Sequence, residues 1–159
     1  MIEEHTYKMY SIVLKQLDGI NSGVQTTHGV CEYIRKHWED KDLQQWLTTD
    51  KTLIVLNGGS TKNIEYIIGM FKESNVKFET FEEEDLGNLT TSICVLADER
   101  VWSKQYMSCI DYLKECTHRK DCNPMSGDFM KMAVKEYHEY IGGGDNAVKK
   151  FILNDLKTA

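Results

Sequence analysis

The chain has 159 residues, of which 41% are hydrophobic and 28% charged, and its formal net charge is −6. These values are typical of one globular domain with an extension, and the acidic balance argues against strong nucleic-acid binding, which depends on clustered Lys and Arg. No apolar stretch reaches the roughly 20 residues of a membrane-spanning helix. The N-terminus is polar and unlike a signal peptide, and five cysteines make an odd number, so we expect a cytoplasmic protein without a disulfide framework.

The first part of the chain predicts a strand, a loop and a helix. A mostly apolar run predicts the strand over residues 8–14, and a loop rich in Asp, Gly, Asn and Ser follows. The next segment carries side chains at helical spacing on one face: Val24, Thr27, Cys31, Ile34 and Trp38. This stripe predicts a helix over about 23–38, with Asn21 or Ser22 as its N-cap and Cys31 as a small buried hydrophobe.

The middle of the chain alternates between helical and strand patterns. A short second helix is expected to end at Leu47. Residues 52–57 are apolar almost throughout, which is typical of a strand covered on both faces. Apolar spacing then predicts a helix over about 61–74, with Ser60 or Thr61 as its cap.

Two further strands complete the predicted sheet. Residues 76–81 alternate between apolar and charged side chains, residues 82–88 form an acidic loop containing a glycine, and residues 92–97 are apolar. The whole order predicts an α/β fold, a three-layer sandwich with a mixed four-stranded sheet. The short last connection favours an antiparallel pairing of the final two strands.

Beyond residue 97 the pattern is purely helical. One apolar stripe runs from Trp102 to Cys116 after a capping Asp98, a second runs over 129–141, and Asp145 would cap a last helix. Three short helices alone bury little surface, so we expect them to pack on the sheet. The predicted division is therefore an α/β domain over 1–97 and a helical extension over 98–159.

The stretch Gly58-Gly59-Ser60-Thr61 joins a buried strand to a helix, which is also the layout of phosphate-binding loops. It lacks the lysine of a Walker loop and the spacing of a dinucleotide fingerprint. We therefore interpret it as a tight turn followed by a capped helix.

Three side chains that could bind a metal lie close together in the chain: Cys116, His118 and Cys122. A closed zinc site would need His138 or Asp121 as a fourth ligand, and the irregular spacing favours a solvated loop. The acidic run over 82–85 could hold a hard cation but is more typical of a solvated turn. We expect no metal and no cofactor.

Gln25 and His28 lie on the first turns of the first predicted helix. They could face a ligand held at the helix N-terminus, where backbone N–H groups are unpaired. Alternatively, Gln25 is solvated and His28 packs against the protein, and spacing alone favours this second interpretation.

The order of elements over residues 8–97 and two short motifs, Gln25-Thr26-Thr27-His28 and Asp85-Leu86-Gly87, resemble the type II peptidyl-tRNA hydrolase family. That family has an apolar strand, a loop and a helix beginning Gln-x-Ser-His. A short helix with a tryptophan follows, here with Trp46, and then a strand, a helix, a strand, an Asp-x-Gly loop and a closing strand. The helical segment after residue 97 has no counterpart in the ordinary family domain.

The resemblance implies hydrolysis of the ester that joins a peptide to tRNA, without a metal. It implies that Gln25 and Asp85 are catalytic, and that Thr90, or its neighbour Thr91, takes the place of the family's threonine. By the same resemblance, the ligand-binding positions are Asn21, Ser22, His28 and Gly87.

Two departures from the family argue against efficient catalysis. The family's Gly-Lys-Gly-Lys stretch is replaced by Gly19-Ile20-Asn21-Ser22, so the lysine position falls near Asn21, and only Lys8 or Lys15 could take its role. The aspartate also lies in a run of acids that would repel a phosphate backbone.

We therefore expect a divergent member that uses the family cleft to bind a small molecule or a protein, with tRNA disfavoured by charge. A first alternative is an active ester hydrolase. A second is an interaction module whose aromatic extension holds a partner or a second copy in a homodimer. The aromatic residues concerned are Trp102, Tyr106, Phe129, Tyr137 and Tyr140.

Overall fold

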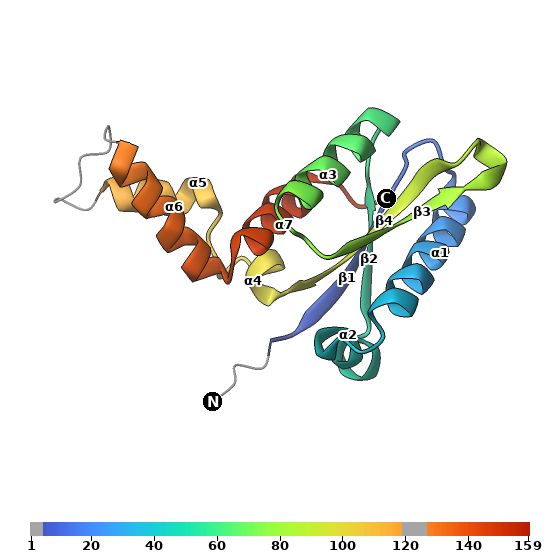
Figure 1. Ribbon diagram of the computed structural model, residues 1–159, viewed down its shortest axis with the longest axis horizontal. Coiled ribbons are helices and arrows are strands. Elements are labelled where there is room, and N and C mark those ends of the chain that lie inside the picture. The colour runs from blue at the N-terminus through green and yellow to red at the C-terminus, as the bar shows by residue number, and fades with distance from the viewer. Residues whose placement is uncertain (1–4, 119–126) are drawn as a thin grey trace.

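A computed structural model describes residues 5–118 and 127–159, with the side chain of Phe129 also outside the description (Figure 1). It confirms the α/β fold with a mixed four-stranded sheet. The strands lie in the order β2-β1-β4-β3, with β1 parallel to β2 and β4 antiparallel to both of its neighbours. Their bounds are Tyr7–Val13 for β1, Thr52–Asn57 for β2, Phe78–Glu83 for β3 and Leu89–Asp98 for β4.

Helices cover both faces of the sheet (Figure 1). On one face, α1 (Gly19–His37) and α2 (Lys41–Gln45) enclose a small core with Met9, Tyr33 and Cys94. On the other face, α3 (Thr61–Glu73) and α7 (Gly144–Asp155) enclose the larger core. Alternate residues of β1 and β4 enter the two cores, because successive side chains of a strand point to opposite faces.

The start of α1 differs from the prediction. The helix begins at Gly19, and the side chain of Asp18 accepts a hydrogen bond from the backbone N–H of Asn21 at 2.9 Å. Asp18 is therefore the N-cap, and Asn21 and Ser22 lie within the first turn. The sequence contained a good capping residue six positions before the start of the apolar stripe, but the stripe placed the helix start too late.

The buried face of α1 was also predicted wrongly. The residues that pack on the sheet are Gln25, Thr26, Gly29 and Tyr33, whereas Val24, Thr27, Cys31 and Trp38 are exposed. Small side chains allow this close approach: a Cβ added to Gly29 would lie 2.6 Å from Ser92 Oγ and 2.8 Å from Cys94 Sγ. In place of the predicted apolar stripe, the face of α1 that meets the sheet makes polar contacts. One of them is a hydrogen bond of 3.0 Å between the hydroxyls of Ser11 and Thr26.

Several other boundaries shift. β3 runs over 78–83 rather than 76–81, and β4 is longer than the predicted 92–97. The helix predicted from Trp102 to Cys116 is two helices, α4 (Glu99–Trp102) and α5 (Cys109–Thr117), and Asp98 caps α4 as predicted. The N-cap of α7 is Gly143, at a φ of 131° that favours glycine, and not Asp145.

The helical extension has two parts. α4 and α7 pack on the sheet and add Val101, Ile152 and Leu153 to the larger core. α5 and α6 (Gly127–Ile141) project to one side of the sheet and pack on each other around Cys116 and Ala133 (Figure 1). The last residues return to the sheet, where the backbone of Thr158 pairs with that of Leu56 at the open edge of β2.

Two buried charged groups hold the extension in place. Asp98, at the end of β4, accepts hydrogen bonds from the Arg100 side chain at 2.7 Å and from Asn146 of α7 at 3.1 Å. Burial raises the pKa of Asp98, but Arg100 and Asn146 outweigh it and hold the pKa below its ordinary value. Lys150 of α7 donates to the carbonyl oxygens of Arg100, Val101 and Ser103, so its ammonium group satisfies the last turn of α4.

The described cysteines, 31, 94, 109 and 116, are free thiols. Cys94 is buried, and burial raises the pKa of its thiol to about 12, whereas Cys31 is exposed on α1, contrary to the prediction. None of the described helices is both long and apolar enough to cross a bilayer.

Replacing Gly29 with alanine should push α1 away from β4, because the new methyl group overlaps Ser92 and Cys94. We expect a loss of about 1–3 kcal/mol in the free energy of unfolding, measured by chemical denaturation. Gly69→Ala in α3 is the matched control, since nothing lies within 4 Å of the added methyl group. The control should be neutral or stabilise by up to about 1 kcal/mol, and equal losses in both variants would contradict the close approach of α1 to the sheet.

Asp98→Ala should lower the free energy of unfolding by about 2–4 kcal/mol, because it removes a helix cap and leaves Arg100 without its carboxylate. Asp155→Ala, an exposed aspartate of α7, should change it by less than about 0.5 kcal/mol. Because the folded-state pKa of Asp98 is lowered, its stabilisation is complete above the unfolded value of about 3.9 and is lost as the pH falls further. The difference between wild type and Asp98→Ala should therefore shrink in acid, and a difference independent of pH would contradict the ion pair.

Candidate functional site

A bulge in the sheet sets up the site beside α1. The pairing of β3 with β4 shifts between Phe81 and Glu82, which leaves Thr91 as an extra residue on β4. A bulge can turn two consecutive side chains to the same face of a strand. Thr91 and Ser92 accordingly both reach Gln25 of α1.

The amide group of Gln25 is fixed by two partners. Thr91 Oγ1 donates to Gln25 Oε1 at 2.5 Å, and Gln25 Nε2 donates to Glu83 Oε2 at 2.7 Å. The Gln25 residue is only 6% exposed, and its backbone oxygen accepts a hydrogen bond from Ser92. These contacts join α1, β3 and β4 through one side chain, and they use only one of the two N–H donors of the Gln25 amide.

A cavity of about 630 Å³ lies beside Gln25, between the β1–α1 loop and the β3–β4 hairpin. Its lining combines apolar and polar side chains: Leu14, Gln16, Leu17, Asn21, Gln25, Thr61, Glu83, Asp85, Leu86 and Leu89. The leucines can hold an apolar group, and the amides and carboxylates can accept hydrogen bonds from a polar one. This volume is within the usual range for small-molecule sites.

Three of the seven predicted site residues line this cavity, namely Asn21, Gln25 and Asp85. The other four lie outside the lining. Ser22 faces a neighbouring cavity of about 320 Å³, and His28 stacks on Phe81 with ring centroids 4.5 Å apart. Gly87 ends the short helical turn over 84–86 at a φ of 71°, which suits a glycine.

The fourth residue is Thr90, which is half-buried opposite Glu82. The hydroxyl that contacts Gln25 belongs to its neighbour Thr91. Sequence reasoning also missed Glu83, the carboxylate that contacts Gln25 directly. Its place in an acidic run was visible in the sequence, but the position of the bulge, which selects Thr91 and Glu83, was not.

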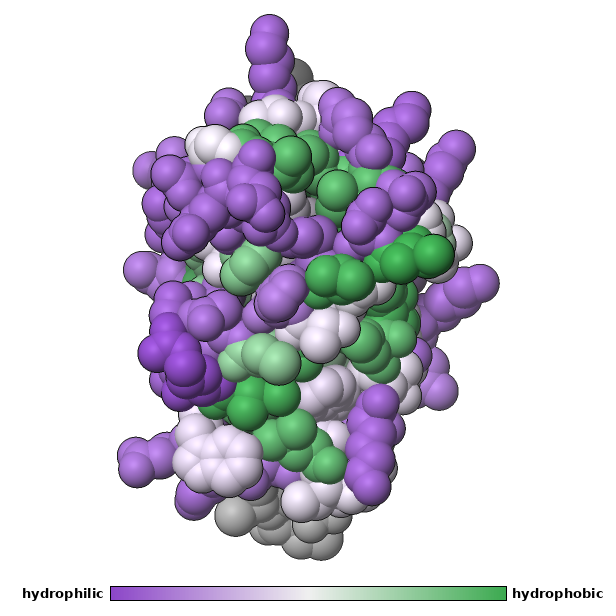
Figure 2. Space-filling view, turned by 90° about the vertical axis from the view of Figure 1, so that its right-hand side faces the viewer, coloured by the Kyte–Doolittle hydropathy of each residue, from purple (hydrophilic) through white to green (hydrophobic). Residues whose placement is uncertain are grey.

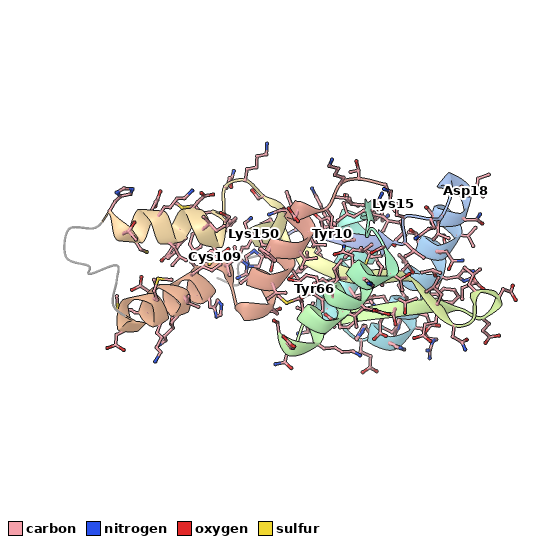
Figure 3. The ribbon with its side chains drawn as sticks, turned by 90° about the horizontal axis from the view of Figure 1, so that it is seen from above. Tyr10, Lys15, Asp18, Tyr66, Cys109 and Lys150 are labelled. Atoms are coloured by element: carbon pink, nitrogen blue, oxygen red, sulfur yellow. The ribbon has the colours of Figure 1, made fainter. Side chains whose placement is uncertain are left out.

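The cavity is acidic. Among the described residues, no lysine or arginine is part of its lining, whereas Glu83 and Asp85 both are. Lys8 lies elsewhere, with Nζ 3.6 Å from the centre of the Trp102 ring. Lys15 is on the loop that leads into α1, as is Asp18 (Figure 3), and it lines the neighbouring cavity instead. The site can therefore accept hydrogen bonds and attract a cation, but it offers no cationic group to stabilise an oxyanion.

The loop between β2 and α3 is internally satisfied. Asn57 Oδ1 accepts from the backbone of Gly59, and Asn63 Nδ2 donates to the oxygen of Gly58 at 2.7 Å. The N-cap of α3 is Ser60, which is one of the two residues predicted for this role. These contacts are those of a tight turn before a capped helix, which was the preferred interpretation.

The possible metal-binding motif of Cys116, His118 and Cys122 falls partly outside the described part of the chain, because Cys122 and Asp121 lie within residues 119–126. Within residues 5–118 and 127–159, no group of three or more His, Cys, Asp or Glu is arranged to hold a metal ion. Cys116 is buried against Ala133 and packs with Tyr112 and Leu113.

A third, smaller cavity of about 200 Å³ lies between α1, α2 and α7. Its walls include Tyr7, Asp98, Arg100 and Lys149. Burial lowers the pKa of Lys149, whose nearest acceptors, Asn146 Oδ1 and Asp145 Oδ2, lie at 3.4 and 3.5 Å. Asp98 is paired with Arg100 and Asp40 with Lys77, so this cavity is mainly the junction between the sheet and the extension.

Thr91→Val should remove the hydroxyl that donates to Gln25 and leave a buried amide oxygen without that partner. We expect a loss of about 1–3 kcal/mol in the free energy of unfolding. Thr90→Val is the matched control, since it makes the same chemical change one residue away, and it should cost less than about 0.5 kcal/mol. If urea denaturation ranks the two variants in the opposite order, the assigned contact is wrong.

Comparisons with known proteins leave the function to be argued from this geometry. No protein-family model matches the chain, and no curated protein matches it. The features of the chain that bear on its function are therefore the Gln25 network, the charge of the cavity and the order of the elements.

Proposed function

We propose that the chain is a divergent protein of the type II peptidyl-tRNA hydrolase kind that uses its cleft to bind a ligand and not to hydrolyse peptidyl-tRNA. One observation carries the proposal. The glutamine of the motif is held at a cavity of about 630 Å³ whose described lining has two carboxylates and no cationic side chain.

The order of the elements supports the family part of the proposal. From β1 to β4 the chain runs through the succession of strands and helices on which the resemblance was based. Gln25 and Asp85, which are far apart in sequence, line one cavity. A motif glutamine and a motif aspartate at the same site are what a shared ancestral cleft would require.

The charge of the cleft supports loss of the hydrolase activity. Ester hydrolysis develops negative charge on an oxygen, and removing one group that stabilises such charge commonly costs about 3–4 kcal/mol of transition-state stabilisation. Here Asn21 takes the place expected for a lysine, and Lys8 is occupied with Trp102. The acidic hairpin would also repel the tRNA backbone, because binding to phosphates requires neutralising cations.

The lining suggests the chemical class of the ligand. Four leucines form an apolar surface, and Glu83 and Asp85 provide negative charge beside it. A small molecule or a chain terminus with an ammonium group and an apolar side chain would match both. The proposal requires no cofactor, and it places the protein in the cytoplasm, where free thiols such as Cys31 and Cys109 stay reduced.

The hydrolase alternative is tested by the release of N-acetylamino acid from N-acetylaminoacyl-tRNA. We expect no release above background from the wild type, and the same from Gln25→Ala and Asp85→Ala. Glu65→Ala, which changes an exposed carboxylate of α3, is the control for general effects on the protein. Turnover that falls at least about tenfold in both cavity variants but not in the control would overturn the proposal, since this is the effect of losing one catalytic group.

Binding in the same cavity can be probed with leucinamide, which has an ammonium, an amide and an apolar group. NMR titration should shift the signals of Gln25 and Leu86 at millimolar concentrations, and Glu83→Gln with Asp85→Asn should weaken the effect. N-acetyl-leucinamide, which lacks the positive charge, should bind less well. Equal shifts with both compounds would contradict the proposed role of the carboxylates.

The aromatic extension is a weaker candidate for the functional surface. Tyr106, Tyr112, Tyr137 and Tyr140 pack on one another with ring centroids 5.2–6.2 Å apart. These rings therefore contact one another within the extension, which leaves less of their surface for a partner. Ile110 and Phe151 remain exposed at a groove of about 330 Å³, but no charged or polar arrangement there indicates a particular partner.

A further inference from the structure

Glu83 is an acidic residue of the 630 Å³ cavity whose side chain is fixed by its contacts. It is half-buried, and its Oε2 accepts a hydrogen bond of 2.7 Å from Nε2 of Gln25, which Thr91 holds in turn. A carboxylate can accept about four hydrogen bonds, so Glu83 keeps acceptor capacity for a ligand. Asp85 lines the same cavity but is exposed. Glu83 is therefore the better placed of the two to hold a cationic group.

Apolar side chains lie next to the carboxylates in the cavity. Asp85 and Leu86 are consecutive residues that both line it, as do Leu89 of the same hairpin and Leu17 of the β1–α1 loop. Leu86 is 51% exposed. The hairpin and the start of α1 lie at the right-hand side of Figure 1, and Figure 2, which faces that side, shows apolar side chains among hydrophilic ones. A ligand that matches this lining has a positive charge and an apolar group close together, as they are when both are attached to one carbon atom.

Among the described residues, the lining has no cationic group to hold a negative charge on a ligand. Two helices begin at the cavity, since Asn21 of α1 and Thr61 of α3 line it, but each has its own cap. Asp18 accepts a hydrogen bond from the backbone of Asn21, and Ser60 accepts one from that of Asn63. A free amino acid would bring its carboxylate close to the acidic groups of the cavity, which like-charge repulsion disfavours. The ligand therefore has a free ammonium group and a carboxyl group that is bonded as an amide or an ester.

The cavity has room for more than one amino-acid residue. Its volume of about 630 Å³ is roughly twenty times the ~30 Å³ that a water molecule occupies in the liquid, and leucinamide has fewer than half as many non-hydrogen atoms. The side-chain amides of Gln16 and Asn21 also line the cavity. An amide both donates and accepts hydrogen bonds, as a peptide group does. The lining therefore suits the peptide groups that follow a first residue.

We propose that the cavity binds the unblocked N-terminus of a peptide or protein chain whose first residue is apolar. Glu83 accepts hydrogen bonds from the α-ammonium group, the leucines contact the first side chain, and Gln16 and Asn21 bind the peptide groups that follow. The proposal rests on the proposed ligand-binding function and narrows its ligand. It also separates this ligand from peptidyl-tRNA, in which the amino group of the esterified residue is acylated and carries no charge.

Calorimetric titration with tripeptide amides tests the recognition of the N-terminus. Leu-Ala-Ala-NH₂ should bind at least about tenfold more tightly than its N-acetylated form, which loses a hydrogen bond between charged groups. Acetyl-Leu-Ala-Lys-NH₂ is the matched control for charge, since it keeps the net charge but moves the ammonium group, and it should bind as weakly as the acetylated peptide. Gly-Ala-Ala-NH₂ should also lose about tenfold or more, because it lacks the apolar side chain. If the charge control or the glycine peptide binds as tightly as Leu-Ala-Ala-NH₂, the proposal is overturned.

A pair of variants tests the role of Glu83. Glu83→Gln should weaken the binding of Leu-Ala-Ala-NH₂ at least about tenfold, because it removes the negative charge but keeps an oxygen that can accept from Gln25. Glu82→Gln makes the same change at an exposed neighbour outside the described lining, and it should change the affinity by less than about threefold. Equal losses in the two variants, both shown to be folded by urea denaturation, would contradict the role given to Glu83.

Leucinamide and free leucine separate the failure of this proposal from the failure of the proposed function. Leucinamide should bind at least about tenfold more tightly than leucine, whose carboxylate would meet the acidic groups of the cavity. Leu-Ala-Ala-NH₂ should bind at least as tightly as leucinamide. If leucinamide binds but leucine binds equally well, or the tripeptide amide does not bind, recognition of an N-terminus is wrong and the proposed function stands. If none of these compounds binds, both are wrong.

Discussion

The carboxylate of Asp98 is the contact on which the arrangement of the two halves depends. It ends β4, caps α4, pairs with Arg100 and accepts a hydrogen bond from Asn146 of α7. A buried carboxylate is tolerated only when such partners replace its water. These partners, Arg100 of α4 and Asn146 of α7, both belong to the extension, so the carboxylate at the end of β4 ties both helices to the sheet. This contact acts together with Ile152 and Leu153, which pack in the larger core, and with the hydrogen bonds of Lys150 to α4 in holding α7 in place.

The inner face of α1 explains how the Gln25 site is built. Gly29 and the hydroxyls of Ser11 and Ser92 let the helix approach the sheet closely, and a close approach leaves room only for small or hydrogen-bonded side chains. Gln25 is therefore held by Thr91 and Glu83 at the cavity. The larger apolar residues of α1 are left on the outside. The buried polar residues and the exposed apolar residues of α1 therefore have one cause, which is the close packing of the helix on the sheet.

Much of the fold could be predicted from the sequence, because apolar periodicity reports local structure directly. The strand over 52–57 was placed without error, and the mixed sheet followed from the order of elements. The orientation of α1 was wrong because periodicity reveals that a helix has an apolar face but not whether that face meets its own sheet. The pairing of Gln25 with Thr91 and Glu83 was missed because a bulge, which changes the register by one residue, leaves no clear pattern in the sequence.

The acidic hairpin sets the charge of the cavity. Its carboxylates, Glu83 and Asp85, give the cavity the charge that disfavours tRNA and favours an ammonium group. The described lining contains no lysine or arginine that would neutralise these carboxylates. Glu83 also holds the amide of Gln25, so the same acidic hairpin both completes the Gln25 network and decides the charge of the ligands that the cavity can hold.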